Sequence, residues 1–153
     1  MLLAAAVAIG ASGCGATTRT TTIQAPAFPT LTSATAIFVS RDHGKDADSA
    51  LTVQLLRNNA ELGAEIRTVG TKFDDNASSG PFAFSMAGRF TKNDIDAGQL
   101  RLRLTPDGDD DWTFDLHVTM RFSDGTARNF MWRGIRLNHT SPERVVTLGP
   151  ART

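Results

Sequence analysis

The clearest pattern in the chain is a strict alternation of apolar and polar side chains between residues 112 and 122. One face of this segment would carry Trp112, Phe114, Leu116, Val118, Met120 and Phe122, and the other Thr113, Asp115, His117, Thr119 and Arg121. Because successive side chains of a strand point to opposite faces, the pattern predicts a long strand with one buried side. The Ser123-Asp124-Gly125 sequence that follows indicates a hairpin turn into another strand over 127–137.

Shorter apolar runs and alternations predict the remaining strands. They lie at 36–39, 51–55, 64–69, 82–86, 100–104 and 145–148, which brings the expected total to about eight. The only helical signal is one turn over 91–96, capped by Thr91. Short strands separated by Gly/Asp-rich turns are typical of an all-β fold, and we predict an antiparallel β-sandwich over residues 34–150.

The first part of the chain has a different composition. Residues 2–11 are apolar or small throughout, which suits the apolar region of a signal peptide and is too short to span a bilayer. After Cys14, residues 15–33 are rich in Thr, Ala, Ser and Pro and show no strand or helix period. We therefore predict a signal peptide over 1–13 and an extended tether over 14–33.

The sequence Ala11-Ser12-Gly13-Cys14 resembles the lipobox of bacterial lipoproteins. The resemblance implies cleavage before Cys14, lipidation of its thiol, palmitate included, and membrane anchoring through that lipid. Gly15, rather than Asp, follows the cysteine, which favours the outer membrane if the host is Gram-negative. No Lys or Arg precedes Cys14, so we expect the natural start upstream of Met1. The alternative is an incidental cysteine in an ordinary secretory signal or a buried helix.

Charge and cysteine content narrow the classes of function. Lys+Arg and Asp+Glu both number 16, so there is no basic excess to neutralise nucleic-acid phosphates, and we predict no nucleic-acid partner. Cys14 is the only cysteine, which fits export without disulfides and leaves no thiol for catalysis in the domain.

Two acidic segments flank predicted strands. Asp42, Asp46 and Asp48 precede the 51–55 strand, and Asp107, Asp109, Asp110 and Asp111 precede the 112–122 strand. Asp48-Ser49-Ala50 before the second strand, the Asp111-Trp112 pair that leads to Val118, and the later aromatic residues Phe130 and Trp132 together resemble the PLAT/LH2 family of β-sandwiches. The resemblance extends roughly over 36–137. It departs from the family pattern at Ala47, where Thr is usual, and in the close spacing of Phe130 and Trp132.

The resemblance implies that the two acidic loops meet at one end of the sandwich and bind calcium, a hard cation that takes six to eight oxygen ligands. Its predicted ligands are Asp42, Asp46, Asp48, Asp107, Asp109 and Asp111. The alternative is an acidic turn in water, with Asp107-Gly108 turning the chain.

No pattern of catalytic residues stands out. His43, His117 and His139 are scattered, and no serine has the context of a nucleophile elbow. Asp115 and His117 share a strand face as a candidate acid/base pair, but we expect His117 to be solvated. We predict a non-enzymatic, lipid-anchored binding module that presents its end loops to a protein, a lipid or a glycan. The alternative is a metal-free structural or assembly lipoprotein of the envelope.

Overall fold

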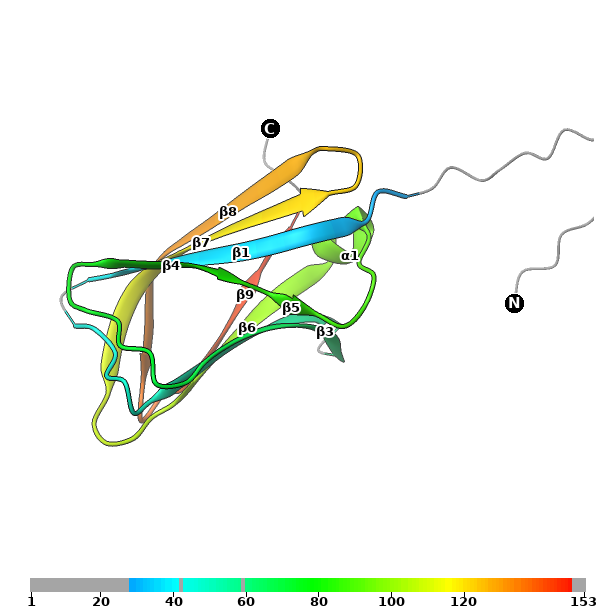
Figure 1. The fold of residues 1–153 in the computed structure, drawn as a ribbon. Helices are drawn as coiled ribbons and strands as arrows, with labels where there is room; N and C mark the ends of the chain where they lie inside the picture. The colour runs from blue at the N-terminus through cyan, green and yellow to red at the C-terminus, as the bar shows by residue number, and fades with distance from the viewer. Residues whose placement is uncertain (1–27, 42, 59, 150–153) are drawn as a thin grey trace, which may run out of the picture.

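The computed structural model describes residues 28–149 except 42 and 59. In chain order the strands are β1 (Leu31–Ser40), β2 (Ala50–Arg57), β3 (Ala60–Thr68), β4 (Ser78–Ala83), β5 (Ser85–Met86), β6 (Gly98–Thr105), β7 (Asp111–Phe122), β8 (Ala127–Asn138) and β9 (Glu143–Thr147), and the helix α1 (Lys92–Asp96) precedes β6. The strands form one sheet in the order β4-β1-β7-β8 and a second in the order β5-β3-β2-β6-β9. All neighbouring strands are antiparallel, so the predicted all-β sandwich is confirmed (Figure 1).

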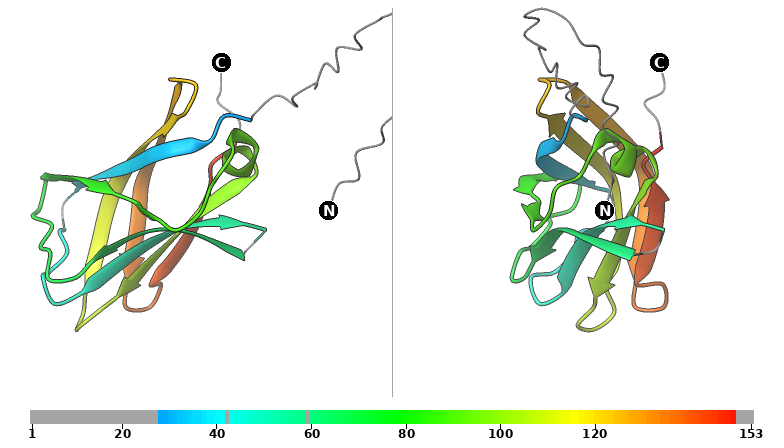
Figure 2. Two further views of the ribbon diagram at one scale, coloured as in Figure 1. Left: turned by 45° about the vertical axis from the view of Figure 1, so that its right-hand side comes forward. Right: turned by 90° about the vertical axis from the view of Figure 1, so that its right-hand side faces the viewer.

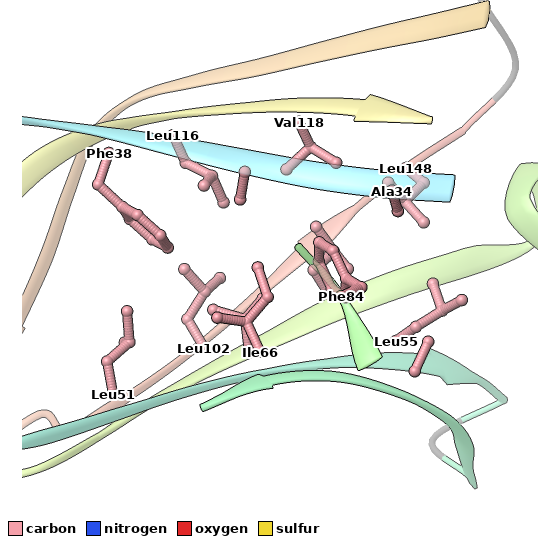
Figure 3. Close-up of a cluster of buried hydrophobic side chains, with 14 of the residues drawn as sticks. Ala34, Phe38, Leu51, Leu55, Ile66, Phe84, Leu102, Leu116, Val118 and Leu148 are labelled. Atoms are coloured by element: carbon pink, nitrogen blue, oxygen red, sulfur yellow. The ribbon is translucent and has the colours of Figure 1, made fainter. Parts of the chain in front are cut away.

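The hydrophobic core fills the space between the two sheets. Phe38, Leu116 and Val118 point down from β1 and β7, and Leu51 and Leu102 point up from β2 and β6 (Figure 3). These side chains are at most 1% exposed. Burial of the two facing apolar sides supplies the main stabilisation of such a sandwich.

Strand β7 confirms the face assignment made from its alternation. All six predicted inward residues, from Trp112 to Phe122, are buried. On the other face His117 and Arg121 are exposed, so the prediction of a solvated His117 is confirmed. The predicted turn at 123–125 is also present, since the Phe122 amide donates to the Thr126 carbonyl oxygen over 2.9 Å and β8 pairs with β7.

The segment 82–86, predicted as one strand, is shared between the two sheets. Residues up to Ala83 pair with β1 in the first sheet, and β5 pairs with β3 in the second. Between them lies the buried Phe84, whose amide donates to the Ala34 carbonyl oxygen over 2.9 Å. The alternation of large and small side chains continues from β4 into β5. The pattern alone therefore predicts one strand, whereas the described residues form two.

The first strand corrects the predicted start of the domain at residue 34. Residues 31–33, assigned to the tether, belong to β1. Leu31 is buried, and its amide donates to the Phe90 carbonyl oxygen over 2.7 Å. The Thr/Ser composition of the segment concealed this pairing, which depends on partners far along the chain.

The short helix α1 confirms the predicted capped turn. The Thr91 hydroxyl accepts from the Asp94 amide, and the Asp94 carboxylate accepts from the Thr91 amide over 2.8 Å. This reciprocal capping box satisfies two amide donors that the first turn leaves free. The buried side chain of Ile95 attaches the turn to the core.

Strand β1 runs from one end of the sandwich to the other. At its start the Thr30 amide donates to the Ser123 hydroxyl over 3.1 Å, beside the β7–β8 hairpin. Beyond its end the Arg41 amide donates to the Thr113 carbonyl oxygen over 2.8 Å. At roughly 3.3 Å per residue these ends are about 30 Å apart. The hairpin and α1 lie at one end, and the β1–β2, β3–β4 and β6–β7 loops lie at the other (Figures 1 and 2).

We predict that Leu116→Ala lowers the free energy of unfolding by about 2–5 kcal/mol, because it leaves a cavity between the sheets. Thr119→Ala, on the outer face of the same strand, should cost less than about 1 kcal/mol. Urea unfolding followed by tryptophan fluorescence measures both, and a larger cost for Thr119→Ala would contradict the observed orientation of β7.

Candidate functional site

An acidic cleft of about 880 Å³ lies at the end of the sandwich opposite α1. Its walls come from the β1–β2, β3–β4 and β6–β7 loops and the start of β7, and we call it the acidic cleft below. Seven aspartates line it: Asp46, Asp74, Asp75, Asp107, Asp109, Asp110 and Asp111. Lys72 and His43 also line the cleft.

The structure brings together the two acidic segments that the sequence singled out. Asp46 from the first segment and Asp107, Asp109 and Asp111 from the second line the same cleft. Asp48 lies near enough to influence the pKa of Asp110. Asp42 lies outside the described residues. The expectation that the two loops meet is confirmed.

Sequence reasoning missed the third wall of the cleft. Asp74 and Asp75 belong to the β3–β4 loop, and the Asp75 carboxylate accepts from the Gly44 amide over 2.6 Å. The available signal was the charged run Lys72-Phe73-Asp74-Asp75 between two predicted strands. Such a run is also typical of an ordinary solvated turn, so it did not stand out.

The buried hydroxyl of Ser49 joins the β1–β2 loop to the β6–β7 loop. Ser49 is 1% exposed, and its oxygen accepts from the Asp107 amide over 2.9 Å. The same hydroxyl donates to the Asp110 carboxylate. The β6–β7 loop is therefore fixed against the start of β2 by a pair of hydrogen bonds through one side chain.

Lys45 is the main residue that sequence reasoning did not identify. Its side chain is fully buried, and its ammonium donates to the carbonyl oxygens of Asp46 (2.6 Å), Thr71 (2.9 Å) and Ser49. Its backbone also pairs with Phe73 through two hydrogen bonds of 2.9 and 2.8 Å. Lys45 thus connects the β1–β2 loop to the β3–β4 loop by both main chain and side chain.

Burial and neighbouring charges act in opposite directions on the ionisable groups beneath the cleft. Burial lowers the pKa of Lys45, while Asp110, Asp48 and Asp46 act to raise it. Burial also raises the pKa of Asp110, with Asp48 and Asp46 adding to the shift and Lys45 opposing it. The positive charge of Lys45 therefore favours the ionised form of the partly buried carboxylate.

Asp111, a predicted calcium ligand, is engaged in an ion pair. Its carboxylate accepts from Nε of Arg136 over 2.7 Å and also from Nη2 of that residue. The hydrogen bond from Arg136 is the largest cause that lowers the pKa of Asp111. This paired arrangement uses both carboxylate oxygens at the rim of the cleft.

A cluster of aromatic rings supports the cleft from below. Trp112 is fully buried, and its Nε1 donates to the Ser40 hydroxyl over 3.0 Å. The Phe73 ring lies 4.7 Å from the Trp112 ring and 5.5 Å from the Phe38 ring, measured between centroids. Since Phe73 adjoins Asp74 and Trp112 adjoins Asp111, the β3–β4 and β6–β7 loops are both attached to a rigid core.

The arrangement of the described side chains bears on whether the cleft could hold calcium. Among residues 28–149 without 42 and 59, no three His, Cys, Asp or Glu side chains are grouped closely enough to hold an ion. Asp111 is paired with Arg136, and Asp110 with Ser49. The described side chains therefore form no preformed calcium site, and calcium binding stays a prediction.

A second groove, of about 500 Å³, lies between β8 and β9, which are edge strands of different sheets. Trp132, Val146 and the arginines Arg133, Arg136 and Arg144 line it. The ring of Trp132 stacks on the ring of Phe130, also on β8, with centroids 5.9 Å apart. We call it the edge groove.

In the candidate acid/base pair on β7, Asp115 is bonded to residues other than His117. The Asp115 carboxylate accepts from Nε and Nη2 of Arg41, each over 3.0 Å, and from the Gly134 amide over 2.8 Å. These partners occupy Asp115 instead of His117. Of the other two histidines, His43 lines the acidic cleft and His139 is exposed.

Comparisons with known proteins found no match among protein-family models, curated proteins or solved structures. The PLAT/LH2 resemblance therefore stays a prediction. Within the part of the chain that the structure describes, no helix is long and apolar enough to cross a membrane. Cys14 and the predicted signal peptide lie outside the described residues.

We predict that Ser49→Ala loosens the β6–β7 loop. The change leaves the Asp107 amide without its acceptor, which should cost about 1–3 kcal/mol of stability. Hydrogen exchange measured by mass spectrometry should show faster exchange at Asp107 in this variant. Ser78→Ala removes an exposed hydroxyl and serves as the control. Equal exchange at Asp107 in both variants would contradict the bridging role of Ser49.

Proposed function

We propose that this protein is a lipid-anchored binding module of the cell envelope that presents the acidic cleft to a positively charged segment of a protein partner. The observation that carries the proposal is the convergence of three loops and seven aspartates on one cleft at the end of a rigid sandwich. Loops held on a rigid scaffold are where such modules commonly bind.

The position of the cleft supports this arrangement. The domain begins beside α1 and the β7–β8 hairpin, whereas the cleft lies at the opposite end, about 30 Å away along β1. With a lipid on Cys14, the chain would approach the domain from the membrane side. The cleft would then be directed away from the membrane to which the protein is attached.

The charge of the cleft favours one class of partner. Its walls carry seven carboxylates and one lysine, Lys72, which already pairs with Asp74 over 2.8 Å. Clustered like charges at a concave surface attract and orient molecules of opposite charge. Of the partners considered from the sequence, a protein with clustered Lys or Arg fits best, because an anionic lipid surface would be repelled.

The edge groove supports the alternative, a structural or assembly lipoprotein that acts without metal. It lies between two sheet edges and carries Arg133 and Arg144, which form no ion pair among the described residues. An acidic chain could be held along it. The two surfaces have opposite charge, so the position at which a partner is captured distinguishes the two functions.

The lipid anchor has its own test. Cells fed a clickable palmitate analogue should label the wild-type protein, and Cys14→Ser should remove the label because the thiol is the acceptor. The label is read after gel separation, with expression of both proteins measured by an antibody to the domain. Equal labelling of the two proteins would contradict lipidation at Cys14.

The partner is tested by site-specific photo-cross-linking in the native envelope. A photoreactive residue at Asp109, in the acidic cleft, should capture a protein that mass spectrometry identifies and whose contacting segment is basic. Capture should weaken as salt is raised, because salt screens exposed charges. The same residue at Met131 reports on the edge groove, and at Arg67, exposed on β3, it is the control.

The outcome decides between the two functions. Capture at Asp109 but not at Met131 or Arg67 supports the cleft as the binding surface. Specific capture at Met131 alone supports the assembly role. An uncharged glycan or a lipid as the sole cross-linked species at Asp109 would contradict a basic protein partner.

A further inference from the structure

We propose that the buried ammonium of Lys45 holds the loops of the acidic cleft together and takes the place of a calcium ion there. The inference concerns how the cleft is built, so it does not depend on which partner the cleft binds.

The geometry around the Lys45 nitrogen is that of a filled cation site. Three main-chain carbonyl oxygens, of Asp46, Ser49 and Thr71, accept hydrogen bonds from it. An ammonium has three N–H donors, whereas a neutral amine has two, so the arrangement matches the charged form. Carbonyl oxygens are also typical ligands of calcium, and here an internal cation already occupies them.

This single nitrogen joins the loops that form the cleft. Its bond to the Thr71 carbonyl oxygen reaches the β3–β4 loop, and its bonds to Asp46 and Ser49 close the β1–β2 loop on itself. Through the Ser49 hydroxyl, which binds both Asp107 and Asp110, the β6–β7 loop is fixed to the same unit. Calcium in a two-loop site would perform the same joining.

Neighbouring groups offset part of the cost of burying this charge. Burial is the largest influence and lowers the pKa of Lys45, and the charges of Asp110, Asp48 and Asp46 oppose that shift. The nitrogen also lies 5.5 Å from the centre of the Phe73 ring, within the range of a cation–π interaction. Because Lys45 is fully buried, its charge is poorly screened by water and acts strongly on these neighbours.

Calcium would have to displace partners that are already in place. Asp111 uses both carboxylate oxygens on Arg136, and Asp110 accepts from Ser49. A metal ion bound among these groups would also lie close to the Lys45 ammonium and be repelled by it. The loops of the cleft are therefore joined by the chain itself at any calcium concentration.

The first test measures melting temperature in calcium, in magnesium and in EDTA, with calcium at about 10 mM, above the dissociation constants of weak extracellular calcium modules. Wild-type melts should coincide in all three solutions. Lys45→Met keeps most of the apolar stem and removes the charge, and it should lower the melting temperature by roughly 10 °C, because three carbonyl groups lose their donor and the nearby carboxylates lose a compensating charge.

Lys72→Met is the matched control. It removes the same charge from the same cleft, but Lys72 is exposed and forms only a surface ion pair with Asp74. Its melting temperature should fall by less than about 3 °C. A wild-type protein that is stabilised by calcium and not by magnesium would overturn the proposal. So would a Lys45→Met variant that melts with the control.

A chemical rescue tests the role of the ammonium directly. Lys45→Ala leaves a space with the shape of the lost propylammonium group, so added propylammonium should raise the melting temperature of this variant in a saturable way. It should not raise that of Lys72→Ala. Tetramethylammonium, which has the charge but no N–H donors, should give no rescue, and equal effects of both cations would contradict the hydrogen-bonded site.

One measurement on the wild type decides the question if the Lys45 variants do not fold. The amides of Lys45 and Phe73 are bonded to each other's carbonyl oxygens, so their hydrogen exchange reports whether the loops are joined. Protection should be the same in EDTA and in calcium. Faster exchange in EDTA would show that calcium joins the loops and would overturn the proposal.

Discussion

A charged group taken out of water must have its hydrogen bonds satisfied, and this requirement shapes the working end of the molecule. Lys45 is fully buried, so its three N–H donors need acceptors within the protein. The main chain provides them where the β1–β2 and β3–β4 loops meet, at the carbonyl oxygens of Asp46, Ser49 and Thr71. This side chain therefore joins the two loops, together with the main-chain hydrogen bonds between Lys45 and Phe73. The Phe73 ring lies against that side chain and packs on Trp112, which fixes the loops to the core.

The rest of the sandwich acts as a spacer between two ends with different properties. Strand β1 joins the end where the domain begins to the end that carries the acidic cleft, and it pairs with β4 and β7 along its length. A strand paired on both sides and buried on one face resists bending, so the separation of the two ends is maintained.

The sequence predicted the strands better than the site, and the reason is physical. A strand with one buried face imposes a period of two, and β7 shows it over its whole length from Trp112 to Phe122. The crossing between β4 and β5 keeps the same period, so only long-range pairing reveals it. Lys45 carries no local signal at all. It lies in a charged run that is typical of a solvated turn. Its burial depends on Thr71, which is 26 residues away in the chain. The carboxylates of the cleft were predicted in part because they are clustered in sequence, whereas Asp74 and Asp75 join them only through folding.

An internal cation has a different consequence for the cleft from that of a bound metal. Calcium ligated by the rim carboxylates would neutralise them and use their oxygens, so little negative charge would remain for a partner. Lys45 instead lies beneath the surface and is bonded to carbonyl groups, which leaves the carboxylates of Asp74, Asp107 and Asp109 exposed. The loops are thus held closed while the cleft keeps its negative charge. If Lys45 takes the place of calcium as we propose, the negative charge of the cleft does not depend on a bound metal. The cleft then combines a preformed shape with a constant negative potential, which are the two properties that a surface needs to select a cationic partner before contact and to hold it without reorganisation.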